Sequence, residues 1–474
     1  MSNTLTADLC VIGAGSAGLS VAAGASQMGA RVILIEKGEM GGDCLNFGCV
    51  PSKALLAAAE VAQTMRDAGR FGIAATEPVI DTAAVRDHVR GVIAAIAPND
   101  SVERFEGLGV QVIQAPARFV GRDTVAADGV RIRAKRTVIA TGSSPLVPPI
   151  PGLDSVPFFT NETIFENASP ISHLLVIGGG PIGMELAQAH RRLGAQVTVI
   201  EMARLFGKDD PELAAVVVKR LEAEGVALHE GTKVVGVEAT GDGIAVVGES
   251  ADGAVRFEGS HLLVAIGRRA NVDGLDLDAA GIESSPRGIT VDASLLTSNR
   301  RIFAIGDVVG PYQFTHMASY QAGIVIRRAL FRLPAKVDYR AVPWVTYTDP
   351  ELAHVGLTET EARDGDGAVR VLTSSFADND RAQAERRTEG ALKVVTGRSG
   401  RVLGASIVGV RAGELLTPWC LMVENKLKIG AMASVIAPYP TLSEIGKRAA
   451  GSYFTASLFG VNTRRLVRFL QWFG

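Results

Sequence analysis

Hydrophobic residues form two similar patterns along the chain, each made of a short apolar run, a glycine-rich turn, an apolar-periodic stretch and a second apolar run. The first pattern lies between residues 9–12 and 31–35, and the second lies between 174–177 and 196–200. Short apolar runs bounded by turn residues are typical of buried strands, and apolar-periodic stretches are typical of helices. Each pattern therefore predicts a strand–helix–strand unit, and a chain of 474 residues is expected to form an α/β protein of roughly two to four domains.

The turn inside each unit has the spacing of a dinucleotide fingerprint. Residues 13–18 read GAGSAG and residues 178–183 read GGGPIG, while Glu36 and Glu201 follow the second strands. Glycine lets the backbone approach a pyrophosphate, the helix N-terminus stabilises its charge, and the acid accepts ribose hydroxyls. The pattern therefore predicts two bound nucleotides. The candidate residues in the turns are Gly13, Gly15, Ser16, Ala17, Gly18, Gly178, Gly180, Ile182 and Gly183.

Two of the four cysteines lie in residues 41–53, which read GGDCLNFGCVPSK. In a regular helix, Cys44 and Cys49 would be about 8–9 Å apart at Cα, whereas a disulfide requires about 4.4–6.8 Å. A bonded pair therefore excludes a regular helix here; Gly48 gives the backbone freedom, and Pro51 suits the first turn of a helix beginning after Cys49. That helix would lower the pKa of the Cys49 thiol, which indicates redox chemistry. A structural disulfide or two buried thiols is the alternative.

Composition narrows the class of protein. The formal charge of −2 gives no basic field for nucleic acid. The N-terminal residues lack the pattern of a signal peptide, and no apolar run reaches membrane-spanning length. We therefore expect a cytoplasmic protein, in which a cysteine pair is more often catalytic than structural.

These motifs resemble those of the FAD-dependent pyridine nucleotide-disulfide oxidoreductases, which include lipoamide dehydrogenase, glutathione reductase and mercuric reductase. The resemblance extends from about residue 7 to residue 450 and includes residues 138–142, 265–271 and 302–307. It implies two Rossmann-like domains, with the NAD(P)H domain inserted in the FAD domain, and a C-terminal α+β dimerisation domain of a homodimer. The implied boundaries are 1–150 and 272–340 for FAD, 151–271 for NAD(P)H, 341–450 for dimerisation and 451–474 for a tail. A helix is expected from about residue 314 to 330, and two helical stretches are expected after residue 341.

The resemblance also implies roles for individual residues. Cys44 corresponds to the interchange thiol and Cys49 to the charge-transfer thiolate. Lys53 corresponds to the lysine beside flavin N5, and Glu185 to the glutamate that pairs with it; a solvated lysine and an exposed acid are the alternatives. The resemblance also implies two further sets of cofactor-binding residues. Those for FAD are Glu36, Lys37, Gly42, Lys53, Ala117, Thr141, Gly142, Gly306, Asp307 and Ala318. Those for the nicotinamide nucleotide are Glu201 and Gly267.

The choice between NADH and NADPH depends on the side chains at the end of the second fingerprint. The Glu201 carboxylate favours NADH, because it accepts hydrogen bonds from a ribose and repels a 2′-phosphate. Arg204 could instead pair with that phosphate, so NADPH stays open.

The electron acceptor also stays open. Lipoamide dehydrogenases and glutathione reductases carry a histidine that can relay a proton, with a glutamate after it, both supplied by the partner subunit. This chain has Tyr439 and Glu444 at those positions, and a phenol is normally protonated at neutral pH. A tyrosine at the position of this histidine is similar to the arrangement in mercuric reductase. However, residues 468–474 lack the terminal cysteine pair of that enzyme. No metal-binding spacing is present, and Cys10 and Cys420 are expected in the core.

Residues beyond 450 predict a short basic amphipathic helix. Leu466, Phe469, Leu470 and Phe473 share one face. This helix could pack on its own dimer or lie on the inner face of an anionic membrane. The leading hypothesis is an NAD(P)H:disulfide oxidoreductase that reduces a small molecule or a small protein; a metal-ion or quinone reductase and a membrane-associated redox sensor that binds partners are the alternatives.

Overall fold

A computed structural model describes residues 4–241, 243–366 and 368–473. The chain forms two compact units: unit 1 holds residues 1–202 and 228–337, and unit 2 holds residues 203–227 and 338–474. Both units combine helices and sheets, so the predicted α/β class is confirmed. The finer domain boundaries stay a prediction.

Unit 1 contains a seven-stranded sheet in the order β3-β2-β1-β6-β5-β4, with β18 also paired to β6. Its strands are β1 (Thr4–Ile12), β2 (Val32–Glu36), β3 (Gln111–Gln114), β4 (Arg118–Gly121), β5 (Thr124–Ala127), β6 (Val130–Ile139) and β18 (Ile302–Ala304). β3, β2, β1, β6 and β18 run parallel, whereas β4 and β5 are antiparallel additions. The carboxyl ends of the parallel strands therefore meet at one edge, where ligands bind in open α/β sheets.

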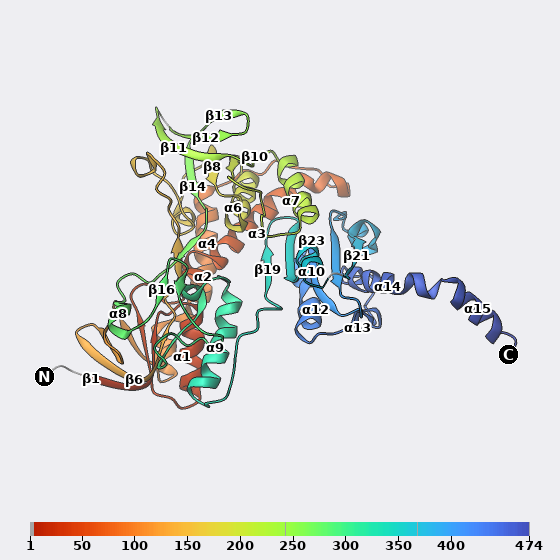
Figure 1. Cartoon of the computed structure of the whole chain (residues 1–474). Helices are drawn as coiled ribbons and strands as arrows, with labels where there is room; N and C mark the ends of the chain where they lie inside the picture. Colours follow the sequence, from red (N-terminus) through yellow and green to blue (C-terminus); the bar gives the residue numbers. More distant parts are fainter. Residues whose placement is uncertain (1–3, 242, 367, 474) are drawn as a thin grey trace. The chain divides into compact units, whose positions relative to one another are not determined.

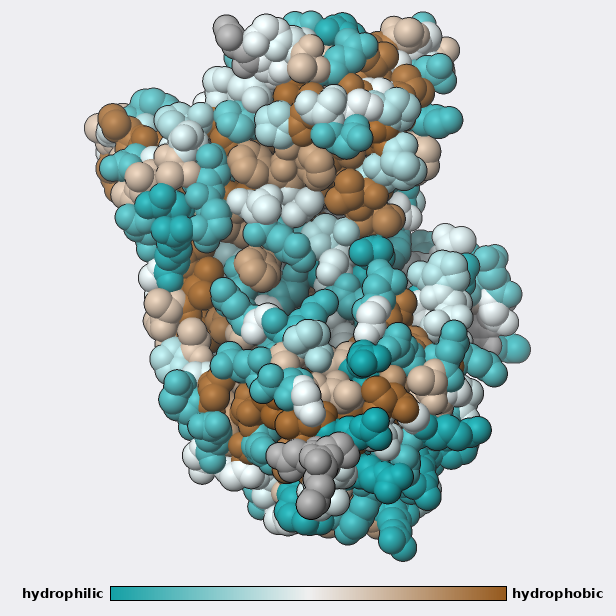
Figure 2. All heavy atoms as spheres, turned by 90° about the vertical axis from the view of Figure 1, so that its left-hand side faces the viewer, coloured by the Kyte–Doolittle hydropathy of each residue, from teal (hydrophilic) through white to brown (hydrophobic). Residues whose placement is uncertain are grey.

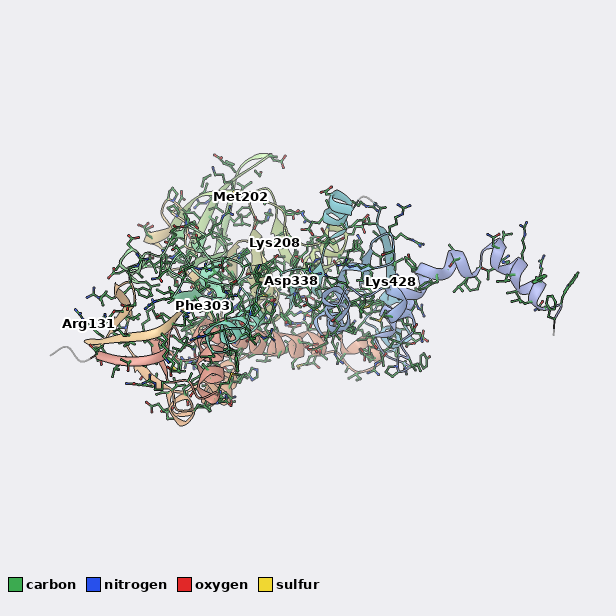
Figure 3. The ribbon with its side chains drawn as sticks, turned by 60° about the horizontal axis from the view of Figure 1, so that its bottom comes forward. Arg131, Met202, Lys208, Phe303, Asp338 and Lys428 are labelled. Carbon is green, nitrogen blue, oxygen red and sulfur yellow. The ribbon has the colours of Figure 1, made fainter. Side chains whose placement is uncertain are left out.

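Side chains of this sheet alternate between two buried clusters. Leu9 and Val11 of β1 pack in the cluster that contains α1 (Ser16–Gln27) and α9 (Thr315–Ala329), whereas Cys10 and Ile12 pack on the other face. Helices α1 and α9 lie against each other on the first face (Figure 1). Phe303 of β18, labelled in Figure 3, belongs to the same cluster. The alternation is the period of two that a strand covered on both faces requires.

The second predicted strand–helix–strand unit also lies in unit 1. β9 (Gln196–Ile200), β8 (His173–Ile177) and β14 (His261–Val264) form a parallel sheet, and α6 (Pro181–Arg192) connects β8 to β9. Both predicted units are therefore confirmed. Their strand ends agree within one residue, except that β1 begins at Thr4, five residues before the predicted run. The other elements nearby are β10 (Val226–His229), β11 (Lys233–Thr240), β12 (Gly243–Ser250) and β13 (Gly253–Gly259).

Two connecting strands join the parts of unit 1. β7 (Ser143–Pro145) pairs antiparallel with β15 (Arg268–Ala270), so the segments before and after the second nucleotide unit lie side by side. The remaining elements are α2 (Gly42–Asn46), α3 (Cys49–Asp67), α4 (Thr82–Ile96), α5 (Val102–Gly107), α8 (Leu277–Ala280), β16 (Ser284–Ser285) and β17 (Gly288–Ile289). The helix expected at 314–330 is α9, which confirms that prediction to within one residue at each end.

Unit 2 is built on a five-stranded antiparallel sheet in the order β19-β20-β23-β22-β21. Its strands are β19 (Pro343–Thr346), β20 (Glu351–Gly356), β21 (Arg370–Ser375), β22 (Ala391–Thr396) and β23 (Val402–Gly409). Its helices are α7 (Pro211–Ala223), α10 (Glu359–Asp366), α11 (Asp380–Ala384), α12 (Ala412–Glu424), α13 (Ile429–Ala433), α14 (Glu444–Leu458) and α15 (Val461–Leu470). The two helical stretches expected after residue 341 are α12 and α14; short helices that were not expected lie between the strands.

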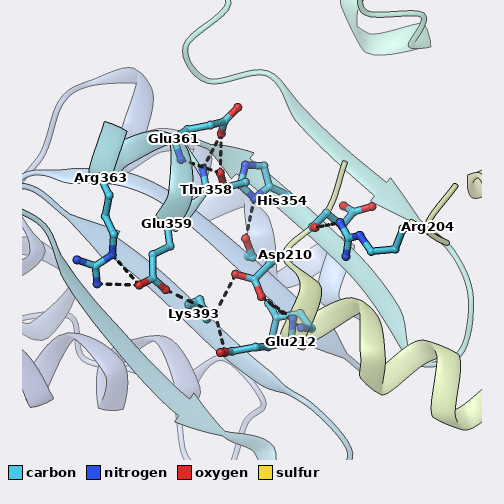
Figure 4. Close-up of polar contacts among 12 residues, drawn as sticks. Arg204, Asp210, Glu212, His354, Thr358, Glu359, Glu361, Arg363 and Lys393 are labelled. Atoms are coloured by element: carbon cyan, nitrogen blue, oxygen red, sulfur yellow. Dashed lines mark hydrogen bonds and ion pairs between the residues drawn. The ribbon is translucent and has the colours of Figure 1, made fainter. Parts of the chain in front are cut away.

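A buried cation connects α7 to this sheet. Lys393 of β22 is 7% exposed, and its Nζ lies 2.9 Å from an Asp210 carboxylate oxygen and 2.7 Å from one of Glu212 (Figure 4). Asp210 also accepts hydrogen bonds from backbone N–H groups in the first turn of α7. A buried charge is stable only when it is paired in this way, so the cluster orients α7 against β22.

On the face shown in Figure 2, hydrophilic side chains predominate and hydrophobic ones form separate patches. None of the described helices combines the length and the hydrophobicity needed to span a bilayer.

Candidate redox-active site

The first glycine-rich turn, between β1 and α1, leaves open space at the middle glycine. Gly13 has a φ of +106°, and a Cβ there would lie 2.4 Å from the Ala140 carbonyl oxygen. A Cβ on Gly18 would lie 1.8 Å from the Gly13 carbonyl oxygen, so neither position accepts a side chain. At Gly15, the residue before α1, the nearest atom would be 3.9 Å away. A pyrophosphate could therefore approach the backbone here, at the positive end of α1.

The second turn, between β8 and α6, repeats this geometry. A Cβ on Gly178, where φ is +115°, would lie 2.4 Å from the Ala265 carbonyl oxygen, and one on Gly183 would lie 2.1 Å from the Gly178 carbonyl oxygen. A Cβ on Gly180 would meet no atom within 4 Å. Two such cradles, each at a helix N-terminus, fit two dinucleotides, as the sequence predicts.

The two acids after the fingerprints also match in geometry. Glu36 Oε2 accepts a hydrogen bond of 2.5 Å from the Ala14 N–H, and Glu201 Oε2 accepts one of 2.6 Å from the Gly179 N–H. Each carboxylate is therefore held beside the turn, where the ribose of a dinucleotide is expected.

The other predicted cofactor-binding residues lie in unit 1, most of them at strand ends or helix starts. Thr141 and Gly142 follow β6, and the Thr141 hydroxyl donates to the Asn271 carbonyl at 2.6 Å. Gly306 donates its N–H to Gln321 at 2.7 Å. Lys37 follows β2 and is exposed, Ala117 lies between β3 and β4, Gly42 begins α2, Ala318 is buried in α9, and Gly267 lies between β14 and β15.

The cysteine pair spans a break between two helices. Cys44 lies in α2, which ends at Asn46, and Cys49 is the first residue of α3. This confirms that the segment is not one regular helix and places Pro51 in the first turn of α3. Gly48 is needed for space: a Cβ there would lie 2.9 Å from Asp43 Oδ2. Both side chains are free thiols, Cys44 partly buried and Cys49 exposed.

The two thiols differ strongly in acidity. The hydrogen bond from Cys44 lowers the pKa of Cys49 to about 6, with further stabilisation from Thr315 and the charge of Lys53. The same interaction raises the pKa of Cys44, and burial adds to that increase. Thr315, the first residue of α9, places its Oγ1 3.7 Å from Cys49 Sγ. Cys49 is therefore the more acidic thiol of the pair, and the sequence did not indicate its contact with Thr315.

Lys53 and Glu185 form an ion pair between α3 and α6. The Lys53 Nζ lies 2.7 Å from Glu185 Oε2, and the Glu185 side chain is 7% exposed. The alternative of an exposed acid at position 185 is therefore wrong, and Lys53, although its side chain is 36% exposed, is paired with that carboxylate. The pair brings the helix of the cysteine motif against the helix of the second nucleotide turn.

A second polar cluster, centred on Arg268, supports the cysteine loop. Arg268 Nη2 lies 3.0 Å from Asp43 Oδ1 and donates at 2.9 Å to the Ser143 carbonyl, and its Nε donates at 2.7 Å to the Ser143 hydroxyl. That hydroxyl donates at 2.6 Å to Asp307, whose pKa burial raises. Asn161 donates to Asp43 at 3.3 Å. The sequence did not indicate these contacts, although Arg268 lies in the motif at 265–271 and Asp43 in the motif at 41–53.

Tyr439 and Glu444 lie in unit 2, on either side of the turn before α14. The Tyr439 hydroxyl donates to Asp380 Oδ2 at 3.0 Å, and this hydrogen bond raises the pKa of Tyr439. Glu444, the first residue of α14, accepts from the Thr441 N–H at 3.3 Å. The phenol is therefore a hydrogen-bond donor at neutral pH.

Arg204, also in unit 2, donates to carbonyl oxygens of its own loop. Its Nη2 lies 3.1 Å from the Gly207 oxygen and 3.0 Å from the Asp209 oxygen (Figure 4). These two hydrogen bonds use the N–H groups of Nη2, so fewer N–H groups of the guanidinium are available to bind a 2′-phosphate.

The remaining cysteines have ordinary positions. Cys10 is fully buried in β1, as predicted, and Cys420 is half-buried in α12; burial raises the pKa of both thiols. Across the described ranges, no cluster of His, Cys, Asp or Glu has the geometry of a metal site.

Comparisons with known proteins identify the same family that the sequence motifs resemble. The family described as pyridine nucleotide-disulphide oxidoreductase matches residues 7–322, and its dimerisation domain matches residues 342–450. Mercuric reductase from Streptomyces lividans is 36% identical over 457 residues, which cover 94% of this chain and 96% of that protein. Dihydrolipoyl dehydrogenase from Thermus scotoductus is 38% identical over 447 residues, which cover 93% and 95%. The Cu(II) complex of the HOCl-induced flavoprotein disulfide reductase RclA from Escherichia coli has a TM-score of 0.84 and 26% identity, over 93% of this chain and 98% of that chain.

Proposed function

We propose that this chain reduces a small thiol-reactive acceptor through Cys44 and Cys49. The chain belongs to the pyridine nucleotide-disulphide oxidoreductase family. Members of this family bind FAD and use NAD(P)H, and so does this chain. The observation that carries the proposal is the polarised dithiol: Cys49 has a pKa lowered to about 6 beside Cys44, whose pKa is raised. The match to the dimerisation domain supports a homodimer.

The residues around the site would have distinct roles. The turns at Gly15 and Gly180 would hold FAD and the nicotinamide nucleotide, which together would supply the two electrons that reduce the sulfur pair. The Lys53 ammonium, kept charged and oriented by Glu185, would favour added electron density nearby. Cys49, as the stabilised thiolate, would keep those electrons on sulfur until an acceptor arrives.

Reduction of a disulfide acceptor would proceed by thiol exchange. The Cys44 sulfur would attack one acceptor sulfur, forming a mixed disulfide and releasing a thiolate that takes the Cys44 proton. The Cys49 thiolate would then attack the Cys44 sulfur, forming the Cys44–Cys49 disulfide and releasing the second thiolate. The acceptor gains two electrons and the dithiol loses two.

A soft metal ion is the second candidate acceptor, and Tyr439 favours it. A phenol that donates to Asp380 and has a raised pKa cannot relay protons as a histidine would. Two sulfur ligands could instead bind a thiophilic ion directly and need no such base. Mercuric reductases are among the similar proteins, and the solved RclA structure is a Cu(II) complex.

NADH is the proposed donor. The Glu201 carboxylate lies beside the second turn, and Arg204 is hydrogen-bonded to its own loop. Both features favour an unphosphorylated ribose.

An acceptor panel tests the proposal. NADH oxidation by the FAD-loaded protein would be followed with lipoamide, oxidised glutathione, Hg(II), Cu(II) and a quinone, with a Cys44→Ser protein as control. Turnover of a disulfide or of a metal ion that Cys44→Ser abolishes supports the proposal and identifies the acceptor class. Equal turnover by both proteins would refute a role for Cys44.

A further inference from the structure

The C-terminal helix α15 exposes a continuous hydrophobic face. None of its residues is buried, and Figures 1 and 3 show it extending beyond α14. Figure 3 shows its side chains pointing away from the helix axis, with no other element of the described part of unit 2 packed alongside them. Leu466, Phe469 and Leu470 are 55%, 58% and 56% exposed, and Phe473, just after the helix, is 74% exposed. At 100° per residue these side chains fall within one quadrant or slightly more of the helix surface. A face this apolar requires a partner.

The opposite side of α15 is basic. Arg464 and Arg468 lie across the helix from the hydrophobic face, and Arg465 borders it. After Glu444 the sequence has no Asp or Glu. The charged side chains after Glu444 are therefore all basic, although the whole chain has a net charge of −2.

We propose that α15 docks this protein on the surface of an anionic lipid bilayer. The aliphatic and aromatic side chains would enter the boundary between headgroups and acyl chains, and the arginines would contact anionic headgroups. Trp472, 87% exposed beside the apolar face, has the amphipathic ring that is enriched at membrane interfaces. Docking would hold the reductase at the membrane without a spanning segment, and it is independent of the acceptor that Cys44 reduces.

The charge pattern of α15 favours an anionic bilayer as the partner. A second copy of the chain could cover the hydrophobic face, but it would not require three arginines and no acidic residue on the rest of the helix. Each basic group near an anionic surface contributes about fivefold to binding, so the three arginines of α15 should contribute on the order of 100-fold.

Vesicle co-sedimentation of the FAD-loaded full-length protein tests the proposal. The vesicles would contain phosphatidylcholine alone or phosphatidylcholine with phosphatidylglycerol. The first variant combines Leu466→Ser, Phe469→Ser and Leu470→Ser; the second changes Arg464, Arg465 and Arg468 to Glu; and the third changes the same arginines to Lys as a matched control. A fourth protein ends at Gly460 and removes the helix altogether. Light scattering would report the oligomeric state of each.

We expect the unmodified protein and the lysine variant to sediment with the anionic vesicles at low salt and to be released by high salt. The serine, glutamate and truncated proteins should bind at least about 100-fold more weakly or not at all, with unchanged flavin absorbance. Absence of binding by the unmodified protein, or equal binding by the truncated one, would overturn the proposal. So would a smaller oligomer in the serine variant, because a second copy would then cover the face.

Discussion

Removal of the Thr315 hydroxyl should raise the pKa of Cys49 by about one unit. Thr315 Oγ1 lies 3.7 Å from Cys49 Sγ, a long hydrogen bond to a group whose pKa is lowered to about 6. A hydrogen bond to a charged group contributes about 1.5–3 kcal/mol, and the length of this one places it at the lower end. Since one pKa unit corresponds to about 1.4 kcal/mol, Thr315→Val should move the pKa to about 7.

The assay is the long-wavelength thiolate–flavin absorption of the reduced enzyme, recorded against pH. The thiolate, and with it the band, is present above the pKa of Cys49 and is lost as the pH falls through it. At pH 6.5 we expect about three quarters of the band in the unmodified protein and about one quarter in Thr315→Val. Thr315→Ser keeps the hydroxyl and serves as the control. Identical midpoints for the valine and serine proteins would refute a role for this hydrogen bond.

Three further substitutions test the polar contacts around the site. Glu185→Gln replaces the ion pair with Lys53 by a neutral contact, and it should slow flavin reduction by NADH on the order of 10-fold in stopped-flow; an unchanged rate would argue against the pair. Arg268→Met leaves Asp43 without its cation and should lower the free energy of unfolding in urea by about 3 kcal/mol, with a smaller loss for Arg268→Lys; equal stability of all three proteins would contradict this. Tyr439→Phe should leave the pH–rate profile unchanged between about pH 6 and 8, because the phenol is protonated throughout; loss of a limb of the profile would show that it transfers protons.

The elements around both nucleotide turns could be predicted from sequence because their signals are local. An apolar run, a GxGxxG turn and a periodic stretch specify strand, turn and helix within about 30 residues, and the structure places β1, α1 and β2 accordingly. The break between Cys44 and Cys49 followed from helix geometry in the same way.

Contacts between distant segments were harder to predict. The Lys53–Glu185 pair was expected only from resemblance to a known family, since 132 positions separate the two residues. The cluster of Arg268 with Asp43 and Ser143 depends on how β7, β15 and α2 pack, and no local pattern encodes that packing. Thr315 was missed for a related reason: the helix was predicted, but its first residue was assigned no contact with Cys49.

The location of α7 was not evident from sequence either. Its capping residue Asp210 pairs with Lys393, and residues 203–227 group with the C-terminal unit, although they directly follow the second nucleotide motif. A buried lysine in a strand gives no indication of its partner before the fold is known.

Anaerobic titration with NADH tests the central claim most directly. The unmodified protein should develop the long-wavelength thiolate–flavin band as the sulfur pair is reduced, Cys49→Ser should lose the band, and Cys44→Ser should show it without added NADH. Persistence of the band in Cys49→Ser would contradict the assignment of Cys49 as the thiolate beside the flavin.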